Sequence, residues 1–407
     1  MEENETPLTF GSIDDKDVTD ISKKRLKRII IIASILLIIV LIIIFIVIFS
    51  NSNKDKNDKE KENKISNSIK AIYDCPGDNT NCDYFYNNKD FNYISLISSL
   101  TVDGKTVPVN NYQQFNKTGN RTVIIQFKEK VKNLTKFFFE CSYLISVDFS
   151  NFDASEMTIM NGLFIECKNL KTINWGSNFS TSKVTDMSYL FYYCSSLKNI
   201  DLSRFDTSNV NNFHFMFANC GNITSLDLKF FDSSNVNDFS GMFFNCISLT
   251  SINLNSFKSD KVKYMSDMFY NCNNLINLDL NNFNTSVLEN AERMFENCNE
   301  LISIEQHFTS EKLKSVERIF GNCRKLEKIN LSGFVGEVLD NMKDMFYNCS
   351  VLSYIDLSNF VGEKCSDTDR VFYDLPSTGN LIYNSLKMNP NFLITLPVGW
   401  NKTDVKL

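Results

Sequence analysis

Histidine and proline are scarce in this sequence, and there is no excess of positive charge. The chain has two histidines, His214 and His307, and six prolines among 407 residues. Two histidines offer little material for a histidine general base or for a metal site built from several imidazoles. The formal net charge is −6, and an acidic chain lacks the basic face that nucleic-acid phosphates require. We therefore expect no nucleic-acid partner.

Motifs of catalytic and cofactor sites are also missing. The sequence contains no GxxxxGK[ST] phosphate loop, no GxSxG elbow and no HExxH pair. It has no C-x-x-C pair suited to zinc and no DxDxDG-like loop suited to calcium. We therefore expect no enzyme activity, no cofactor and no resident metal.

One long hydrophobic run, residues 29–49, carries no charge, proline or glycine. About 20 such residues span a bilayer as a helix, and a secretory signal core is shorter. We interpret the run as a single transmembrane signal anchor between a disordered cytosolic tail (1–28) and a polar stalk (50–68). Basic residues abut its N-terminal end, which predicts a single-pass plasma-membrane protein with an extracellular C-terminal domain. A cleaved signal, cut near residues 50–52, is the alternative.

Nine of the twelve cysteines recur at intervals of 25 to 27 residues, and the register extends beyond them. A Phe stands three residues before each of the nine, and Leu or Ile stands three residues after. The repeat cysteines are Cys141, Cys167, Cys194, Cys220, Cys246, Cys272, Cys298, Cys323 and Cys349. A fixed period of this length is typical of stacked supersecondary units that bury a continuous core.

Each repeat contains two different periodicities. In residues 197–203, Ile200 and Leu202 alternate with polar residues, which predicts a strand. A turn follows at 206–209. Apolar residues then recur at helical spacing, namely Val210, Phe213, Met216, Phe217 and Cys220. We therefore expect an α/β repeat of about ten strand–turn–helix coils over residues 137–383.

The repeat core, Met/Leu-Phe-x-x-Cys-x-x-Leu, is clear in residues 188–210 and 241–257. These segments resemble the BspA-type leucine-rich repeat, the 26-residue bacterial surface protein repeat. The resemblance covers residues 137–383. It implies a leucine-rich-repeat solenoid and surface display, with adhesion or binding but no shared ligand.

The two ends of such an array need caps, because a terminal coil exposes core and a sheet edge. Residues 69–136 are interpreted as a β-rich N-terminal cap, in which Asp103-Gly104 predicts a hairpin turn. The tenth coil is degenerate, with Leu375 at the cysteine position. Residues 384–407 are interpreted as a C-terminal cap.

The repeat cysteines occupy core positions, one to a coil. Stacked helices would lie about 9 Å apart, beyond the reach of a disulfide, so we interpret these nine as buried apolar residues. Cys75 and Cys82 bracket a short turn-rich loop. We interpret them as a candidate disulfide pair.

One polar position stands out on the predicted strands, seven residues after each repeat cysteine. We call this set the strand ladder: Asp148, Asn174, Asp201, Asp227, Asn253, Asp279, Glu305, Asn330 and Asp356. Adjacent strands are about 4.8 Å apart, so these side chains should form a mostly acidic row. We interpret it as a candidate binding stripe for a basic or hydroxyl-rich partner. The alternative is a solubilising face whose side chains bond neighbouring coils.

Together these features predict a cell-surface protein whose leucine-rich-repeat ectodomain mediates adhesion or binds an extracellular protein or glycan. Two alternatives remain open at this point. One is a structural surface-coat component, and the other is a membrane-anchored scaffold that faces the cell interior.

Overall fold

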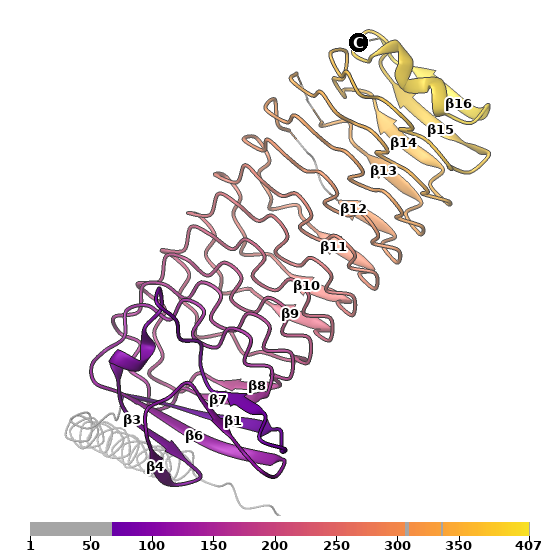
Figure 1. The fold of residues 1–407 in the computed structure, drawn as a ribbon. Coiled ribbons are helices and arrows are strands. Elements are labelled where there is room, and N and C mark those ends of the chain that lie inside the picture. The colour runs from indigo at the N-terminus through magenta and orange to yellow at the C-terminus, as the bar shows by residue number, and fades with distance from the viewer. Residues whose placement is uncertain (1–66, 306–308, 335–336, 407) are drawn as a thin grey trace, which may run out of the picture. The chain divides into compact units, whose positions relative to one another are not determined.

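The structure is a computed structural model that describes residues 67–305, 309–334 and 337–406. Within this part the predicted repeat solenoid is confirmed, and short strands lie along one side of the stacked coils (Figure 1). Their bounds are β7 (Leu144–Asp148), β8 (Thr172–Asn174), β9 (Ser225–Asp227), β10 (Ser251–Asn253), β11 (Asn277–Asp279), β12 (Ser303–Glu305), β13 (Lys328–Asn330) and β14 (Tyr354–Leu357). Strands of adjacent coils pair in parallel. The coil of Cys194, with residues 197–203, forms no strand.

The first coils join a β-sheet built from the preceding residues. Its order is β4-β3-β6-β1-β7-β8, and β1 runs antiparallel to both β6 and β7. The strands that precede the coils in this sheet are β1 (Ser68–Cys75), β3 (Ile97–Val102), β4 (Lys105–Val107) and β6 (Gly119–Phe127). Two further strands, β2 (Asn81–Asp83) and β5 (Tyr112–Gln114), pair in a separate small sheet, and η2 (Tyr93–Leu96) is a short 3-10 helix. The β3–β4 hairpin turns at Asp103 and Gly104, whose φ angles of 49° and 77° suit the tight turn. The sheet thus covers the open edge of the first coil.

At the C-terminal end, β15 (Thr378–Tyr383) and β16 (Gly399–Asp404) extend the parallel sheet, and the short 3-10 helix η3 (Pro390–Thr395) lies between them in the chain. The Trp400 ring is buried, and its Nε1–H donates to the Pro376 carbonyl at 2.8 Å. A Cβ at Gly379 would lie 2.6 Å from that ring. Glycine at position 379 therefore lets the indole close the end of the core.

A stack of phenylalanine rings runs through the core. The Phe three residues before each repeat cysteine packs against its equivalents in the adjacent coils, and the Phe269 centroid lies 5.3 Å from that of Phe243 and 5.8 Å from that of Phe295. The stack comprises Phe138, Phe164, Phe191, Phe217, Phe243, Phe269, Phe295, Phe320, Phe346 and Phe372. All ten rings are fully buried. Each aromatic contact crosses a coil boundary, so the coils stabilise one another.

The predicted helix of each coil is wrong. The described residues contain two short 3-10 helices, η2 and η3, and no α-helix, so the fold is a β-solenoid. It is neither an α/β strand–turn–helix array nor a leucine-rich-repeat solenoid of that kind. The apolar spacing that suggested a helix is produced instead by a run of tight turns over the eight residues before each cysteine. We call this stretch the turn side of the coil.

Backbone geometry explains the error. Two positions of every turn side have φ between 51° and 64°, a left-handed conformation that ends an α-helix. Five residues before the cysteine position these are Lys136, Gly162, Tyr189, Phe215, Gly241, Asp267, Arg293, Arg318, Asp344 and Arg370. One residue before it they are Glu140, Glu166, Tyr193, Asn219, Asn245, Asn271, Asn297, Asn322, Asn348 and Asp374. The turns repeat every four residues and so mimic the apolar period of a helix.

Alternate amides of the turn side bond along the stack rather than along the chain. The amides of Tyr189 and Tyr193 donate to the carbonyls of His214 and Ala218 in the next coil, each at 2.9 Å. Between them, the Tyr192 amide donates to the carbonyl three residues back, at 3.1 Å. No residue in this run makes the i to i−4 bond of an α-helix.

The membrane prediction also needs correction. No helix among the described residues is long and apolar enough to cross a bilayer, so the assignment as a single-pass plasma-membrane protein is not supported. The segments on which it was based, the tail (1–28), the proposed span (29–49) and nearly all of the stalk (50–68), lie outside the described residues.

Candidate functional site

The strand ladder lies at the C-terminal ends of the strands. Asp227 and Asn253 are paired in register across β9 and β10, as are Asp279 and Glu305 across β11 and β12. The other placements are Asp148 in β7, Asn174 in β8, Asn330 in β13, Asp356 in β14 and Asp201 in the coil without a strand. The structure therefore brings the predicted residues onto one side, although the strand pairing is interrupted between coils.

Most ladder side chains bond within their own coil. The Oδ1 of Asp201 accepts a hydrogen bond from the Ser203 amide at 2.9 Å. The same hydrogen bond, from the amide two residues later to the ladder side chain, recurs in other coils. It is made by Asp148, Asn174, Asp227, Asn253, Asp279, Asn330 and Asp356. Hydrogen bonds from Ser203 hold the pKa of Asp201 below its usual range. The ladder residues thus shape the turn after each strand.

Bonds between ladder residues of adjacent coils are fewer. Asn174 Nδ2 donates to Asp148 Oδ1 at 3.1 Å, and Asn253 Nδ2 approaches Asp227 Oδ1 at 3.5 Å. The carboxylates of Asp148, Asp201, Asp227, Asp279 and Asp356 already accept amides of their own turns. The residues that follow them are therefore the better candidates for recognition by the strand side.

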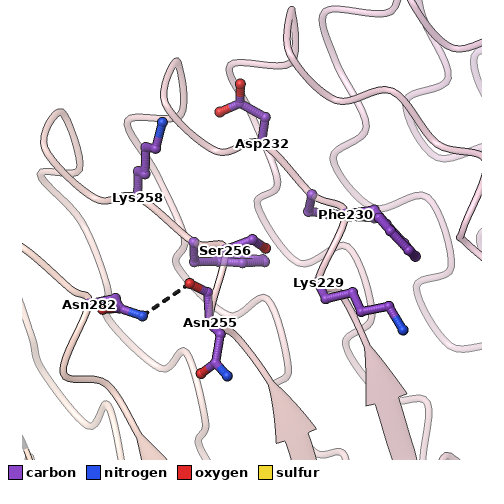
Figure 2. A pocket seen from close by; sticks show the side chains of 9 residues that line it. Lys229, Phe230, Asp232, Asn255, Ser256, Lys258 and Asn282 are labelled. Carbon is purple, nitrogen blue, oxygen red and sulfur yellow. Dashed lines mark hydrogen bonds between the residues drawn. The ribbon is translucent and has the colours of Figure 1, made fainter.

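A groove lies immediately after the ladder, at the corner beyond β9 and β10 (Figure 2). It has a volume of about 610 Å³. Its lining is Lys229, Phe230, Phe231, Asp232, Asn255, Ser256, Phe257, Lys258 and Asn282. Two adjacent coils and the start of a third contribute these residues, so the groove exists only in the stacked array.

Phe230 is the unusual residue of this groove. Its side chain is 56% exposed, whereas the neighbouring Phe231 is 1% exposed and stacks on Phe205 and Phe257 in the core. At the position ten residues after the cysteine, most other coils carry a polar residue or glycine, namely Asn151, Ser177, Arg204, Ser256, Asn282, Gly333 and Asn359. The exception is Phe308, in the coil of Cys298, which is one residue short. Phe230 was not predicted from the sequence, although an aromatic residue at this position in a coil of full length was a signal that could have revealed it.

Polar groups surround the exposed ring. Lys229 Nζ lies 5.0 Å from the Phe230 centroid and 2.7 Å from Asp227 Oδ2, which links the groove to the strand ladder. On the other side, Asn282 Nδ2 donates to the Asn255 carbonyl at 3.0 Å, the bond drawn in Figure 2. Within the described residues, the side-chain amide of Asn255 and the ammonium of Lys258 make no hydrogen bond.

The groove therefore offers an aromatic ring, two ammonium groups, an amide and the carboxylate of Asp232. Hydrogen bonds from Ser234 lower the pKa of Asp232 and keep it ionised. This combination suits non-covalent recognition of a ligand that has both apolar and hydrogen-bonding surface. Among the described residues there is no cluster of three or more His, Cys, Asp or Glu side chains that could hold a metal ion.

The cysteines fall into two groups. Cys75 and Cys82 are joined by a disulfide bond. The repeat cysteines are free and buried, and from Cys167 onward each thiol donates to the carbonyl of the stacked Phe in the preceding coil, as Cys194 does to Phe164 at 3.2 Å. Burial raises their thiol pKa values. They belong to the core and not to a site.

Comparison with known families identifies the repeat. The family described as "Mycoplasma protein of unknown function, DUF285" matches three overlapping stretches, residues 132–226, 199–308 and 276–384. The chain belongs to the DUF285 family. The matched residues include every coil and the whole strand ladder, and they span more than half of the chain. This supports a repeat family, although not the BspA name in particular. No curated protein matches the chain.

Proposed function

We propose that this DUF285 solenoid is a binding protein, without catalytic activity, that recognises a glycan or a protein through the groove beside β9 and β10. The observation that carries the proposal is the exposed Phe230 ring among unpaired polar groups. A large exposed aromatic side chain costs solubility and adds nothing to the core, so its presence favours a ligand contact. The BspA-type resemblance of the repeat, which implies adhesion or binding, agrees with this proposal.

The groove chemistry favours a ligand rich in hydroxyl groups. Asn255 offers both a donor and an acceptor, and Lys258 offers a charged donor. The Phe230 ring supplies an apolar platform between them. A glycan has alternating apolar and hydroxyl surfaces that match this arrangement, and a polar protein loop is the second ligand class.

A binding screen of the purified full-length chain tests the proposal. The probes are a panel of neutral and acidic oligosaccharides and a panel of extracellular proteins. For the ligand found, Phe230→Ala should weaken binding about tenfold or more, as expected for a central aromatic contact. Asn255→Ala should weaken it less, because it removes one hydrogen-bonding group.

Tyr354→Ala is the matched control, since Tyr354 is an exposed aromatic residue on the strand side, in β14, outside the groove. It should leave the affinity unchanged. Binding that survives Phe230→Ala would overturn the groove as the site. Self-assembly of the chain without any glycan or protein ligand would favour a structural coat component instead.

A further inference from the structure

A strip of aromatic side chains crosses the turn side of four consecutive coils. The Tyr189 and Phe215 rings are parallel at 5.7 Å, Phe215 and Phe244 are 5.8 Å apart, and Phe244 and Tyr270 are parallel at 4.8 Å. Tyr192 packs edge-on against Tyr189 at 5.6 Å. We call Tyr189, Tyr192, Phe215, Phe244 and Tyr270 the aromatic strip. All five are half-buried, so part of each ring reaches the surface.

The strip is not required by the backbone. Tyr189 and Phe215 have φ of 55° and 51°, although Gly162 and Gly241 occupy the same position in neighbouring coils. A bulky side chain in this conformation carries a strain that glycine avoids. At Gly241 a Cβ would come within 2.5 Å of the Phe215 ring. The ring therefore lies against the glycine of the next coil, and the two residues fit together.

Cations lie over a tyrosine ring at the C-terminal end of the strip and over Tyr193, which packs edge-on against Tyr192 at 5.2 Å, beside its N-terminal end. At the C-terminal end, the Arg293 guanidinium lies 5.1 Å from the Tyr270 centroid and 2.8 Å from Asp267. At the N-terminal end, Lys168 Nζ lies 5.9 Å from the ring of Tyr193, which is 40% exposed, and 3.0 Å from Glu166. The chain thus repeats one arrangement, a cation that contacts both an aromatic ring and a carboxylate.

A third instance lies further along the turn side. Arg318 and Arg370 both lie over Tyr347, at 5.9 and 5.8 Å, and both pair with Asp344. Arginine over an aromatic ring and beside a carboxylate is therefore a recurring contact on this side of the solenoid.

The central part of the strip has rings and carboxylates but no such cation. The turn-side segments 186–193, 212–219, 238–245 and 264–271 contain no Lys or Arg. Asp238 Oδ1 accepts the Ser240 amide at 2.7 Å, and its Oδ2 lies 3.4 Å from His214 Nδ1. His214 packs edge-on against Tyr189 at 5.4 Å. Asp186 Oδ1 likewise accepts a hydrogen bond from the Ser188 amide at 2.9 Å.

We propose that the aromatic strip, with Asp186 and Asp238, binds the arginine or lysine side chains of a basic segment of a partner protein. The partner supplies the cations that the chain itself supplies at either end. The strip spans four coils, about 14 Å at about 4.8 Å per coil, and alternate side chains of an extended segment are about 6.7 Å apart. Three alternating basic side chains of one segment would therefore fit along it. This site is separate from the groove at Phe230.

The test uses the full-length chain and two fluorescent peptides. One is a short peptide with arginine at alternate positions, and the other has citrulline, the uncharged isostere, at the same positions. Anisotropy titrations should give binding of the arginine peptide about tenfold or more tighter than that of the citrulline peptide. Phe244→Leu and Tyr192→Leu, which keep apolar bulk but lose the ring, should each weaken the arginine peptide about threefold or more.

Charge-matched controls separate this site from general attraction to an acidic protein. Asp238→Asn should weaken binding, whereas Asp279→Asn, the same charge change on the strand side, should not. Phe230→Leu, in the groove, should also leave binding of the arginine peptide unchanged. This control distinguishes the aromatic strip from the groove as the peptide site. Equal binding of the two peptides, or equal effects of Asp238→Asn and Asp279→Asn, would overturn the proposal. Circular dichroism of each variant checks that the fold is intact.

Discussion

The thiol of Cys246 donates a hydrogen bond to the carbonyl oxygen of Phe217 in the preceding coil, at 3.2 Å. The same carbonyl accepts the amide of Cys220. Cysteine is small enough for the space beneath the ring stack and can use the second lone pair of that oxygen. This role explains why the cysteines keep the repeat register without forming disulfides or metal sites.

Thiol reactivity should therefore depend on unfolding. Burial raises the pKa of Cys246, Cys298 and Cys349 to about 12, so almost no thiolate exists at pH 8. We expect an aromatic disulfide reagent to label essentially no thiol of the native chain. In guanidinium chloride it should label ten, the twelve cysteines less the Cys75–Cys82 pair. Rapid labelling of several thiols in the native protein would contradict this account.

The ring stack should dominate stability. Phe269→Ala removes a fully buried ring that contacts Phe243 and Phe295, so it should lower the free energy of unfolding by about 3–5 kcal/mol. Phe230→Ala, at an exposed ring, should change it by less than about 0.5 kcal/mol. Denaturant titrations of the two variants give this comparison. Similar losses for both would mean that Phe230 is part of the core.

Asparagine at the left-handed positions contributes in two ways. Asn245 has φ of 55°, and its Nδ2 donates to Asn219 Oδ1 at 2.9 Å, while Asn271 donates to Asn245 in turn at 2.7 Å. Asn245→Ala loses both bonds and adds left-handed strain, so it should cost about 1–2 kcal/mol. Asn245→Gly loses the same bonds without that strain and should cost less. A larger loss for glycine, measured by thermal melts, would show that backbone strain is unimportant here.

Asp238 should make the fold sensitive to acid. Burial raises the pKa of this carboxyl, but the His214 imidazole 3.4 Å away and hydrogen bonding from Ser240 outweigh burial and lower the pKa overall. Its folded pKa is thus below the unfolded value of about 3.9. The resulting stability is present above that value and is lost as the pH falls through the folded pKa.

Asp238→Asn isolates this effect, because an amide oxygen can still accept the Ser240 amide. At pH 7 the variant should be less stable than the wild type, and the gap should narrow below about pH 4. Chemical denaturation at pH 7 and pH 3 measures it. A gap of the same size at both values would exclude the ionised carboxylate as the cause.

The repeat period, the stacked phenylalanines and the positions of most strands could be predicted from the sequence, because each coil buries the same residues at the same spacing. The conformation of the turn side could not be predicted from the apolar pattern. Met216, Phe217 and Cys220 fit a helical period and equally a run of four-residue turns. Asn at the position before the cysteine, and Gly162 and Gly241 four residues earlier, were the signals that favour left-handed turns.

The strand ladder illustrates a second limit. Its residues lie where the pattern predicted. The hydrogen bond that Asp201 accepts from the Ser203 amide, however, is formed within one turn. A row of polar residues that stabilise turns and a row that binds a ligand have the same spacing, so the sequence could not distinguish them. Phe230 was hidden for a different reason. It sits beside Phe231, and only comparison with the same position in other coils separates the exposed ring from the buried one.

Alternate turn-side amides, such as those of Tyr189 and Tyr193, bond to the next coil. Every internal coil therefore presents the same donors to one neighbour and the same acceptors to the other. Duplication or loss of a whole coil would leave each remaining junction with a complete set of partners. A lineage could thus lengthen or shorten its recognition surfaces by copying one stretch of DNA, without redesigning the termini that close the stack.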